Sequence, residues 1–205
     1  MSKLRLHILF TLFSLLLLLP GCDAKPKIRP LASGATILAF GDSLTHGNGA
    51  GAGESYPAQL EELLGVRVVN AGVPGEVSTA GVNRLPGVLE TVQPQLVILI
   101  HGGNDFLRRL DVAQTKENLR AMILACRQQG ADVVLAGVPQ LGLFLAPAPF
   151  YAELAKEYRL PYLDDTLSDI LKDNRLKSDA IHPNAAGYRQ LATALAELIH
   201  AAEGR

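Results

Sequence analysis

The chain has 205 residues, of which 48% are hydrophobic and 19% are charged, and its formal net charge is −1. This length suits one domain with a buried core, and the apolar content excludes an intrinsically disordered chain. The near-neutral charge, the absence of Trp and the 5% aromatic content argue against a nucleic-acid-binding protein, which needs a basic surface and stacking rings.

The N-terminal segment has the pattern of a signal peptide. Lys3 and Arg5 precede an apolar run over residues 8–19. This run is shorter than the ~20 residues that cross a bilayer as a helix, so it does not predict a membrane span. We therefore expect residues 1–21 to be a cleaved signal that directs the domain to the periplasmic side of the cell envelope.

The end of this segment, Leu19-Pro20-Gly21-Cys22, resembles a bacterial lipoprotein signal, in which the cysteine becomes the acylated first residue. We expect Cys22 to be lipidated and to provide the membrane contact, and residues 22–34 to form a tether before a domain over 35–205. Secretion as a soluble periplasmic protein and an uncleaved anchor are the alternatives. Cys126 would then be the remaining thiol, and its apolar surroundings in the sequence predict a buried side chain.

From residue 35 onward, strand-like and helix-like stretches alternate. Continuous apolar runs, typical of strands covered on both faces, span residues 36–40, 67–70, 96–100 and 132–138. This alternation implies an α/β protein with a parallel sheet between helix layers.

The helices between these runs have recognisable starts, stripes and stops. Tyr56-Pro57 opens one that reaches residue 64, and Gly130 ends another, whose apolar stripe includes Cys126. Asn184 is positioned to cap the last helix. Pro86 is expected to break or bend the segment 78–92.

Polar residues follow the predicted strands at their carboxyl ends, where open α/β sheets bind ligands. Ser43 lies at a strand-to-helix turn, and a serine hydroxyl needs an adjacent base to act as a nucleophile. His182 differs from the other histidines because a carboxylate, Asp179, precedes it by three residues on the same turn. Ser43, His182 and Asp179 therefore predict a Ser-His-Asp triad. The Ser43 and Gly75 N–H groups and the Asn104 amide are the available oxyanion donors.

Other interpretations of these residues are less specific. Ser43 alone would suit a helix N-cap, and Asp42 and Asp105 are expected to be structural acceptors of nearby N–H groups. His46 and His101 are expected to be packing or pocket-wall residues. The glycine-rich stretch 46–53 nearly fits a dinucleotide fingerprint, but it starts too far after the strand and lacks the downstream acidic residue, so it predicts a loop beside the site.

Together and in this order, four strings resemble the four blocks of the SGNH (GDSL) hydrolase family, most closely its thioesterase/lysophospholipase and arylesterase branch. They are Gly41-Asp42-Ser43-Leu44, the segment 70–76, Gly102-Gly103-Asn104-Asp105 and the segment 179–183. The resemblance covers residues 35–199. Two positions depart from the branch: Pro74-Gly75-Glu76 replaces the commoner Ser-Gly-Asp, and His101 stands where an acidic or apolar residue is common.

The resemblance implies a three-layer αβα sandwich, flavodoxin-like, around a five-stranded parallel sheet in the order 2-1-3-4-5. It also implies Ser43 as nucleophile, Asp179 and His182 as its triad partners, and Gly75 and Asn104 as oxyanion donors with Ser43. That order of strands would place Ser43 and Asn104 on either side of the switch point.

We therefore expect a serine esterase that hydrolyses small acyl esters or thioesters through an acyl-enzyme, as a monomer without a cofactor or metal. Apolar segments containing Leu107 and Phe144 are expected to line the acyl-binding pocket. A carbohydrate or cell-wall O-acetylesterase of the same family is the alternative activity. A non-catalytic surface-binding module would keep the fold but would not need the triad.

Overall fold

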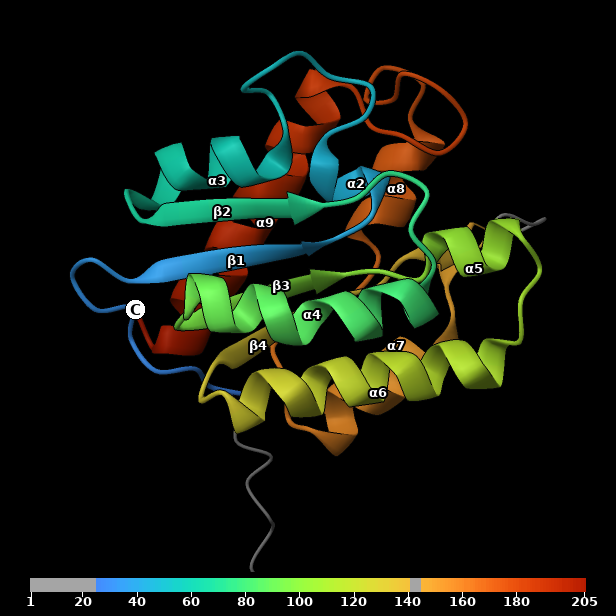
Figure 1. Cartoon of the computed structure of the whole chain (residues 1–205). Helices are drawn as coiled ribbons and strands as arrows, with labels where there is room; N and C mark the ends of the chain where they lie inside the picture. Colours follow the sequence, from blue (N-terminus) through green and yellow to red (C-terminus); the bar gives the residue numbers. More distant parts are fainter. Residues whose placement is uncertain (1–24, 141–144) are drawn as a thin grey trace, which may run out of the picture.

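A parallel β-sheet runs through the centre of the domain, as seen in a computed structural model that describes residues 25–140 and 145–205 (Figure 1). Its five strands lie in the order β2-β1-β3-β4-β7. They are β1 (Thr36–Gly41), β2 (Arg67–Gly72), β3 (Leu96–Ile100), β4 (Asp132–Ala136) and β7 (Tyr162–Leu163). Counted along the chain this is 2-1-3-4-5, so the expected α/β sandwich and strand order are confirmed.

Two layers of helices cover the sheet. The helices are α2 (Ser43–His46), α3 (Tyr56–Leu64), α4 (Ser78–Val92), α5 (Gly103–Leu107), α6 (Val112–Gln128), α7 (Pro149–Glu157), α8 (Thr166–Lys172) and α9 (Ala185–Glu203). α4 and α6 pack together on one face, and α3 and α9 pack together on the other (Figure 1). A two-stranded antiparallel ribbon, β5 (Pro139–Gln140) with β6 (Ala146–Pro147), follows β4.

The strand sequences explain their places in the sheet. All five residues of β3 are buried, as are the last five residues of β1, because both strands are covered on two faces. β2 lies at the edge, and its residues are exposed or half-buried. β7 has two residues, which is too short for an apolar run to reveal it in the sequence.

Two helices begin where the sequence predicts. Tyr56 opens α3 with Pro57 in its first turn, and the Asn184 side chain accepts the Gly187 N–H at the start of α9. Cys126 is fully buried in α6, where burial raises the pKa of its thiol to about 12. Pro86 lies inside α4, which continues to Val92, so the helix does not break there.

The first described residues are bound to the end of the sheet opposite to the strand carboxyl ends. Ile28 is buried and donates its N–H to Ala202 O near the end of α9 (3.2 Å). The Arg29 N–H and side chain both reach Asp132, the first residue of β4. Residues 28 and 29, within the expected tether, therefore lie against the domain. No helix among residues 25–140 and 145–205 has both the length and the apolar composition needed to span a membrane.

Candidate active site

The site lies at the carboxyl ends of β1 and β3, where the chain turns from β1 directly into the short helix α2. Asp42 caps this helix by accepting the Leu44 N–H (3.1 Å), and Ser43 is its first residue. Gly41 allows the turn because a Cβ there would lie 2.1 Å from Ile100 O of the neighbouring strand. Ser43 is thus presented at the switch point between β1 and β3.

Ser43, His182 and Asp179 form a continuous hydrogen-bonded chain. His182 Nε2 lies 2.9 Å from Ser43 Oγ, and His182 Nδ1 lies 2.8 Å from Asp179 Oδ2. The His182 side chain is 13% exposed and that of Asp179 is 54% exposed. The serine oxygen therefore faces a ring nitrogen whose opposite nitrogen is held by a carboxylate, as a general base requires.

The second oxygen of Asp179 fixes the turn that carries the histidine. Asp179 Oδ1 accepts the Ile181 and His182 N–H groups, each at 2.8 Å. Burial tends to raise the pKa of Asp179, but the hydrogen bonds from the His182 ring and from these two N–H groups outweigh it and lower the pKa. Asp179 is therefore held as the carboxylate and positions both the ring and the backbone of His182.

The glycine-rich loop expected beside the site packs against the turn that carries His182. A Cβ on Gly49 would lie 2.1 Å from Ser178 Oγ and 2.5 Å from Pro183 O, so this contact requires glycine. The Tyr188 hydroxyl donates to Asn48 O (2.8 Å), so α9 also holds this loop. The loop thus packs against the residues on either side of His182 and helps to hold the histidine turn in place.

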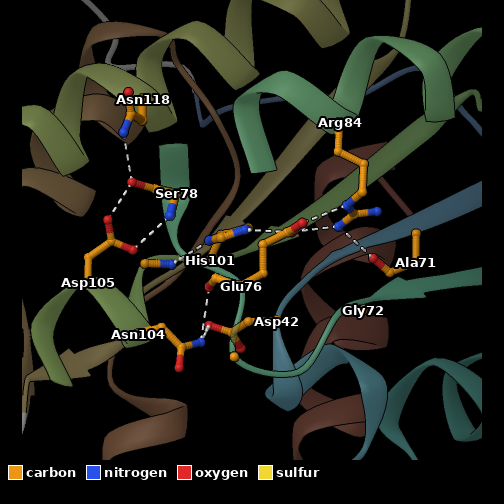
Figure 2. A network of polar contacts seen from close by, with 12 residues as sticks. Asp42, Ala71, Gly72, Glu76, Ser78, Arg84, His101, Asn104, Asp105 and Asn118 are labelled. Carbon is orange, nitrogen blue, oxygen red and sulfur yellow. Dashed lines mark hydrogen bonds and ion pairs between the residues drawn. The ribbon is translucent and has the colours of Figure 1, made fainter. Parts of the chain in front are cut away.

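Asn104 lines the same pocket as Ser43 and is hydrogen-bonded to the residue that follows Gly75. Asn104, in α5, donates its side-chain amide to Asp42 Oδ2 (3.2 Å) and to the Glu76 main-chain oxygen (3.1 Å) (Figure 2). Gly75 has φ +77° in the loop between β2 and α4. Burial raises the pKa of Asp42 despite the opposing effects of His101, His182 and its hydrogen bonds. The two hydrogen bonds of the Asn104 amide therefore connect it to the Gly75 turn, through Glu76, and to Asp42, which directly precedes Ser43.

A mostly apolar pocket opens beside the serine. Ser43, Asn104 and His182 line it, and its apolar lining includes Phe106, Leu107, Val138, Pro139, Leu171 and Ile181. Leu107 lies in the pocket lining; Phe144 falls outside the described residues, as does Cys22. The pattern of the sequence did not indicate Leu171 or Ile181, because they come from α8 and the histidine turn and meet only in the folded chain.

The remaining polar residues near the site have structural partners. His46 Nδ1 lies 3.0 Å from Asn48 Oδ1 and is exposed, whereas His101 is fully buried. Asp105 accepts the Ser78 N–H (2.8 Å) and hydroxyl (2.6 Å), in the structural role expected for it. Arg108 is exposed and donates to Gly75 O (2.8 Å), a contact that the sequence did not predict.

Comparison with known proteins gives a family match over most of the chain. The sequence model of the GDSL-like lipase/acylhydrolase family matches residues 39–190, which include every described residue of the candidate triad and oxyanion set. The chain is 32% identical to "Esterase TesA" of Pseudomonas aeruginosa, covering 85% of this chain and 92% of that protein. It is 33% identical to "Thioesterase 1/protease 1/lysophospholipase L1" of Escherichia coli, covering 75% and 77% of the two chains.

Solved structures agree with this match. The structure of TesA superposes with a TM-score of 0.72 at 29% identity and covers 82% of this chain and 99% of its own. The esterase EstA of Pseudoalteromonas superposes with a TM-score of 0.75 at 22% identity, covering 83% and 99%, which is a likeness of fold.

Proposed function

Because the chain belongs to the GDSL-like lipase/acylhydrolase family and is a serine hydrolase of ester bonds, we propose that it cleaves carboxylic esters or thioesters of apolar acyl groups through an acyl-enzyme on Ser43. The observation that carries this proposal is the hydrogen-bonded chain from Ser43 through His182 to Asp179. A hydroxyl without such a base would be a poor nucleophile at neutral pH.

In the first half of the reaction, His182 Nε2 removes the Ser43 proton as Oγ attacks the substrate carbonyl. Asp179 holds the proton on Nδ1 and stabilises the imidazolium that forms. The imidazolium then protonates the leaving alcohol or thiol, which leaves the acyl group on Ser43. Water, deprotonated by the same nitrogen, attacks the acyl-enzyme in the second half and releases the acid and the free serine.

The negative oxygen of the tetrahedral intermediate is stabilised by the Ser43 and Gly75 N–H groups and by the Asn104 amide. Ser43 contributes because the first N–H groups of a helix have no partner within that helix. The Glu76 oxygen keeps one Asn104 N–H, and the developing oxyanion replaces Asp42 as the acceptor of the other.

The pocket supports an apolar acyl chain as the group that is transferred. Phe106 and Leu107 line it from α5, Leu171 from α8 and Ile181 from the histidine turn. An apolar wall favours hydrocarbon over a sugar ring, which needs polar partners and stacking surfaces. The name of the Escherichia coli relative makes a thioester and a lysophospholipid candidate substrates, and that of a 28% identical arylesterase of Vibrio mimicus adds an aryl ester.

The test compares Ser43→Ala, Asn104→Ala and the unchanged protein on p-nitrophenyl esters of increasing chain length, an acyl-CoA, a lysophospholipid and acetyl-xylan. Ser43→Ala should abolish turnover and labelling by a fluorophosphonate probe while the circular dichroism spectrum stays the same. Asn104→Ala should lower kcat by about 10²–10³, the usual effect of losing one oxyanion donor. Turnover by Ser43→Ala would refute the assignment of the nucleophile, and a preference for acetyl-xylan would indicate an O-acetylesterase instead.

We also propose that the domain acts on the periplasmic side of the envelope and is held at a membrane by an acylated Cys22. The basic, apolar and small-residue order of residues 1–22 supports this proposal.

A further inference from the structure

A cluster of charged and polar side chains, buried or half-buried, adjoins the candidate oxyanion loop and takes no part in the triad. Its members are Glu76, from that loop, Arg84, from α4, and His101, which follows β3 (Figure 2). The Glu76 side chain is 6% exposed and His101 is fully buried. Burying a charged group costs folding free energy unless the group is fully paired, so the partners of the Glu76 carboxylate matter.

Arg84 forms a bidentate pair with the Glu76 carboxylate through two hydrogen bonds. Arg84 Nε donates to Oε1 (2.8 Å) and Nη2 donates to Oε2 (2.7 Å), and Nη2 also donates to Ala71 O at the end of β2 (3.1 Å). The guanidinium lies over the Phe40 ring of β1, 4.2 Å from the ring centre. This bidentate geometry fixes the direction of the carboxylate as well as its charge.

His101 holds the same carboxylate from the opposite side. Its Nδ1 accepts the Gly102 N–H (2.9 Å), so in the neutral ring the proton is on Nε2, which donates to Glu76 Oε2 (3.1 Å). Gly81 in α4 leaves room for the ring, because a Cβ there would lie 2.4 Å from His101 Nε2. The helix is therefore shaped to let the histidine reach the glutamate.

The backbone around Glu76 contains one candidate oxyanion donor, the Gly75 N–H, and binds a second, the Asn104 amide. The Glu76 N–H donates to Val73 O (3.1 Å), which closes the turn Val73-Pro74-Gly75-Glu76 with Gly75 at φ +77°. Proline followed by glycine with positive φ is the signature of a type II turn. The Glu76 main-chain oxygen accepts the Asn104 amide. One residue thus joins the Gly75 turn to the Asn104 side chain.

We propose that Glu76 and Arg84 are positioning residues for the oxyanion hole, with His101 as their third partner. Their ion pair fixes the Glu76 backbone, which sets the direction of the Gly75 N–H and of the Asn104 amide before substrate binds. This inference rests on the proposed roles of Gly75 and Asn104 and adds residues that touch neither the substrate nor the triad. Donors held in place in advance stabilise charge in the transition state more than they help ground-state binding, so the effect belongs in kcat.

The test uses Glu76→Gln and Arg84→Met, measured with a short p-nitrophenyl ester and with an alkylboronic acid. Ser43 Oγ adds to the boron while its proton passes to His182, and the resulting tetrahedral, negatively charged adduct mimics the intermediate. In Glu76→Gln, an NH₂ in place of Oε1 would face Arg84 Nε, and one in place of Oε2 would face both Arg84 Nη2 and His101 Nε2, so at least one contact is lost whichever way the amide turns. Both variants should lower kcat by about 10- to 100-fold, the usual effect of a small misplacement, and weaken boronate inhibition by a similar factor, with KM near that of the unchanged protein.

Two further variants separate positioning from a general loss of stability. Ile199→Ala truncates a fully buried side chain of α9 away from the cluster, and it should lower the melting temperature without changing kcat below that temperature. Arg84→Lys keeps the positive charge beside Glu76 but loses the bidentate hydrogen bond, so its kcat should lie between those of Arg84→Met and the unchanged protein. The double variant Glu76→Gln/Arg84→Met should lose no more than the more affected single variant, because both changes break the same contact.

An unchanged kcat in folded Glu76→Gln, or a fall in kcat without weaker boronate inhibition, would overturn the proposal. If Glu76→Gln does not fold, Arg84→Lys supplies the same comparison of kcat with boronate inhibition. The parent assignment fails differently: turnover by Ser43→Ala would refute the proposed function itself. Loss of activity in Ser43→Ala and Asn104→Ala with full activity in the cluster variants would refute only the positioning role.

Discussion

The paired carboxylate of Glu76 makes a quantitative prediction about acid stability. Burial tends to raise its pKa, but hydrogen bonds from Arg84 and His101 and the charge of Arg84 outweigh burial and lower the pKa from 4.5 to about 2. In the unfolded chain these partners are lost and the group returns to its ordinary value. At 1.36 kcal/mol for each pKa unit, the difference corresponds to roughly 3 kcal/mol of folding free energy.

The sign follows from which state binds the proton more readily. Between pH 4.5 and about 2 the unfolded chain is protonated at Glu76 before the folded chain is, so the contribution is fully present above pH 4.5 and is lost as the pH falls through this window. The free energy of unfolding of the unchanged protein should therefore decline more steeply there than that of Glu76→Gln, which cannot titrate. The gap between the two proteins should be widest near neutral pH.

The assay is urea unfolding followed by circular dichroism at a series of pH values, with Asp173→Asn as the control. The pKa of Asp173 is likewise lowered to about 2, by hydrogen bonds from Arg175, but 87% of the Arg175 side chain is exposed. Solvent weakens such surface pairs, so Asp173→Asn should follow the unchanged protein closely. Parallel curves for Glu76→Gln and the unchanged protein would refute the reasoning, because a buried pair would then contribute no more than a surface pair.

Three other predictions concern the triad support, the pocket and the envelope. Gly49→Ala should lower kcat by about 10- to 100-fold by displacing the histidine turn; Gly53→Ala, whose φ is also positive but whose Cβ would meet nothing within 4 Å, should leave kcat near the original, and equal losses in the two would contradict this. Leu107→Ala should lower kcat/KM for p-nitrophenyl octanoate by about tenfold and affect the acetate much less; an equal effect on both esters would remove Leu107 from the acyl wall. Cys22→Ala should abolish incorporation of an alkyne-labelled fatty acid, and continued labelling would exclude this cysteine as the acylation site.

Local patterns in the sequence were enough to predict four of the five strands of the parallel sheet and the starts of α3 and α9. The apolar runs at β1 and β3 were readable because both strands are covered on two faces, so nearly every residue had to be apolar. β7 could not be predicted in this way, because two residues are too few to form a recognisable apolar run. Pro86 was expected to break or bend its segment, yet the helix continues through it, since packing of α4 against α6 and β1 holds it together.

The candidate triad shows the same division. Asp179 and His182 lie three residues apart, so their pairing is a local property of one turn that the sequence displays. Ser43 lies 139 residues before His182, and the prediction that they meet came from the order of the strings and their resemblance to a family. The structure supplies the distance between them because α9, which follows the histidine turn, packs against α3, which follows the turn that carries Ser43.

The sequence alone was enough to identify the candidate catalytic residues, because a nucleophile, its base and a carboxylate are recognised by residue type and by their place after strands. The residues that we propose to position the oxyanion donors became visible in the folded chain alone. Glu76, Arg84 and His101 come from a loop, a helix and the end of a strand, and no spacing along the chain links them. They meet because α4, with glycine at position 81, lies close enough to His101 for the buried Glu76 carboxylate to bind both Arg84 and His101.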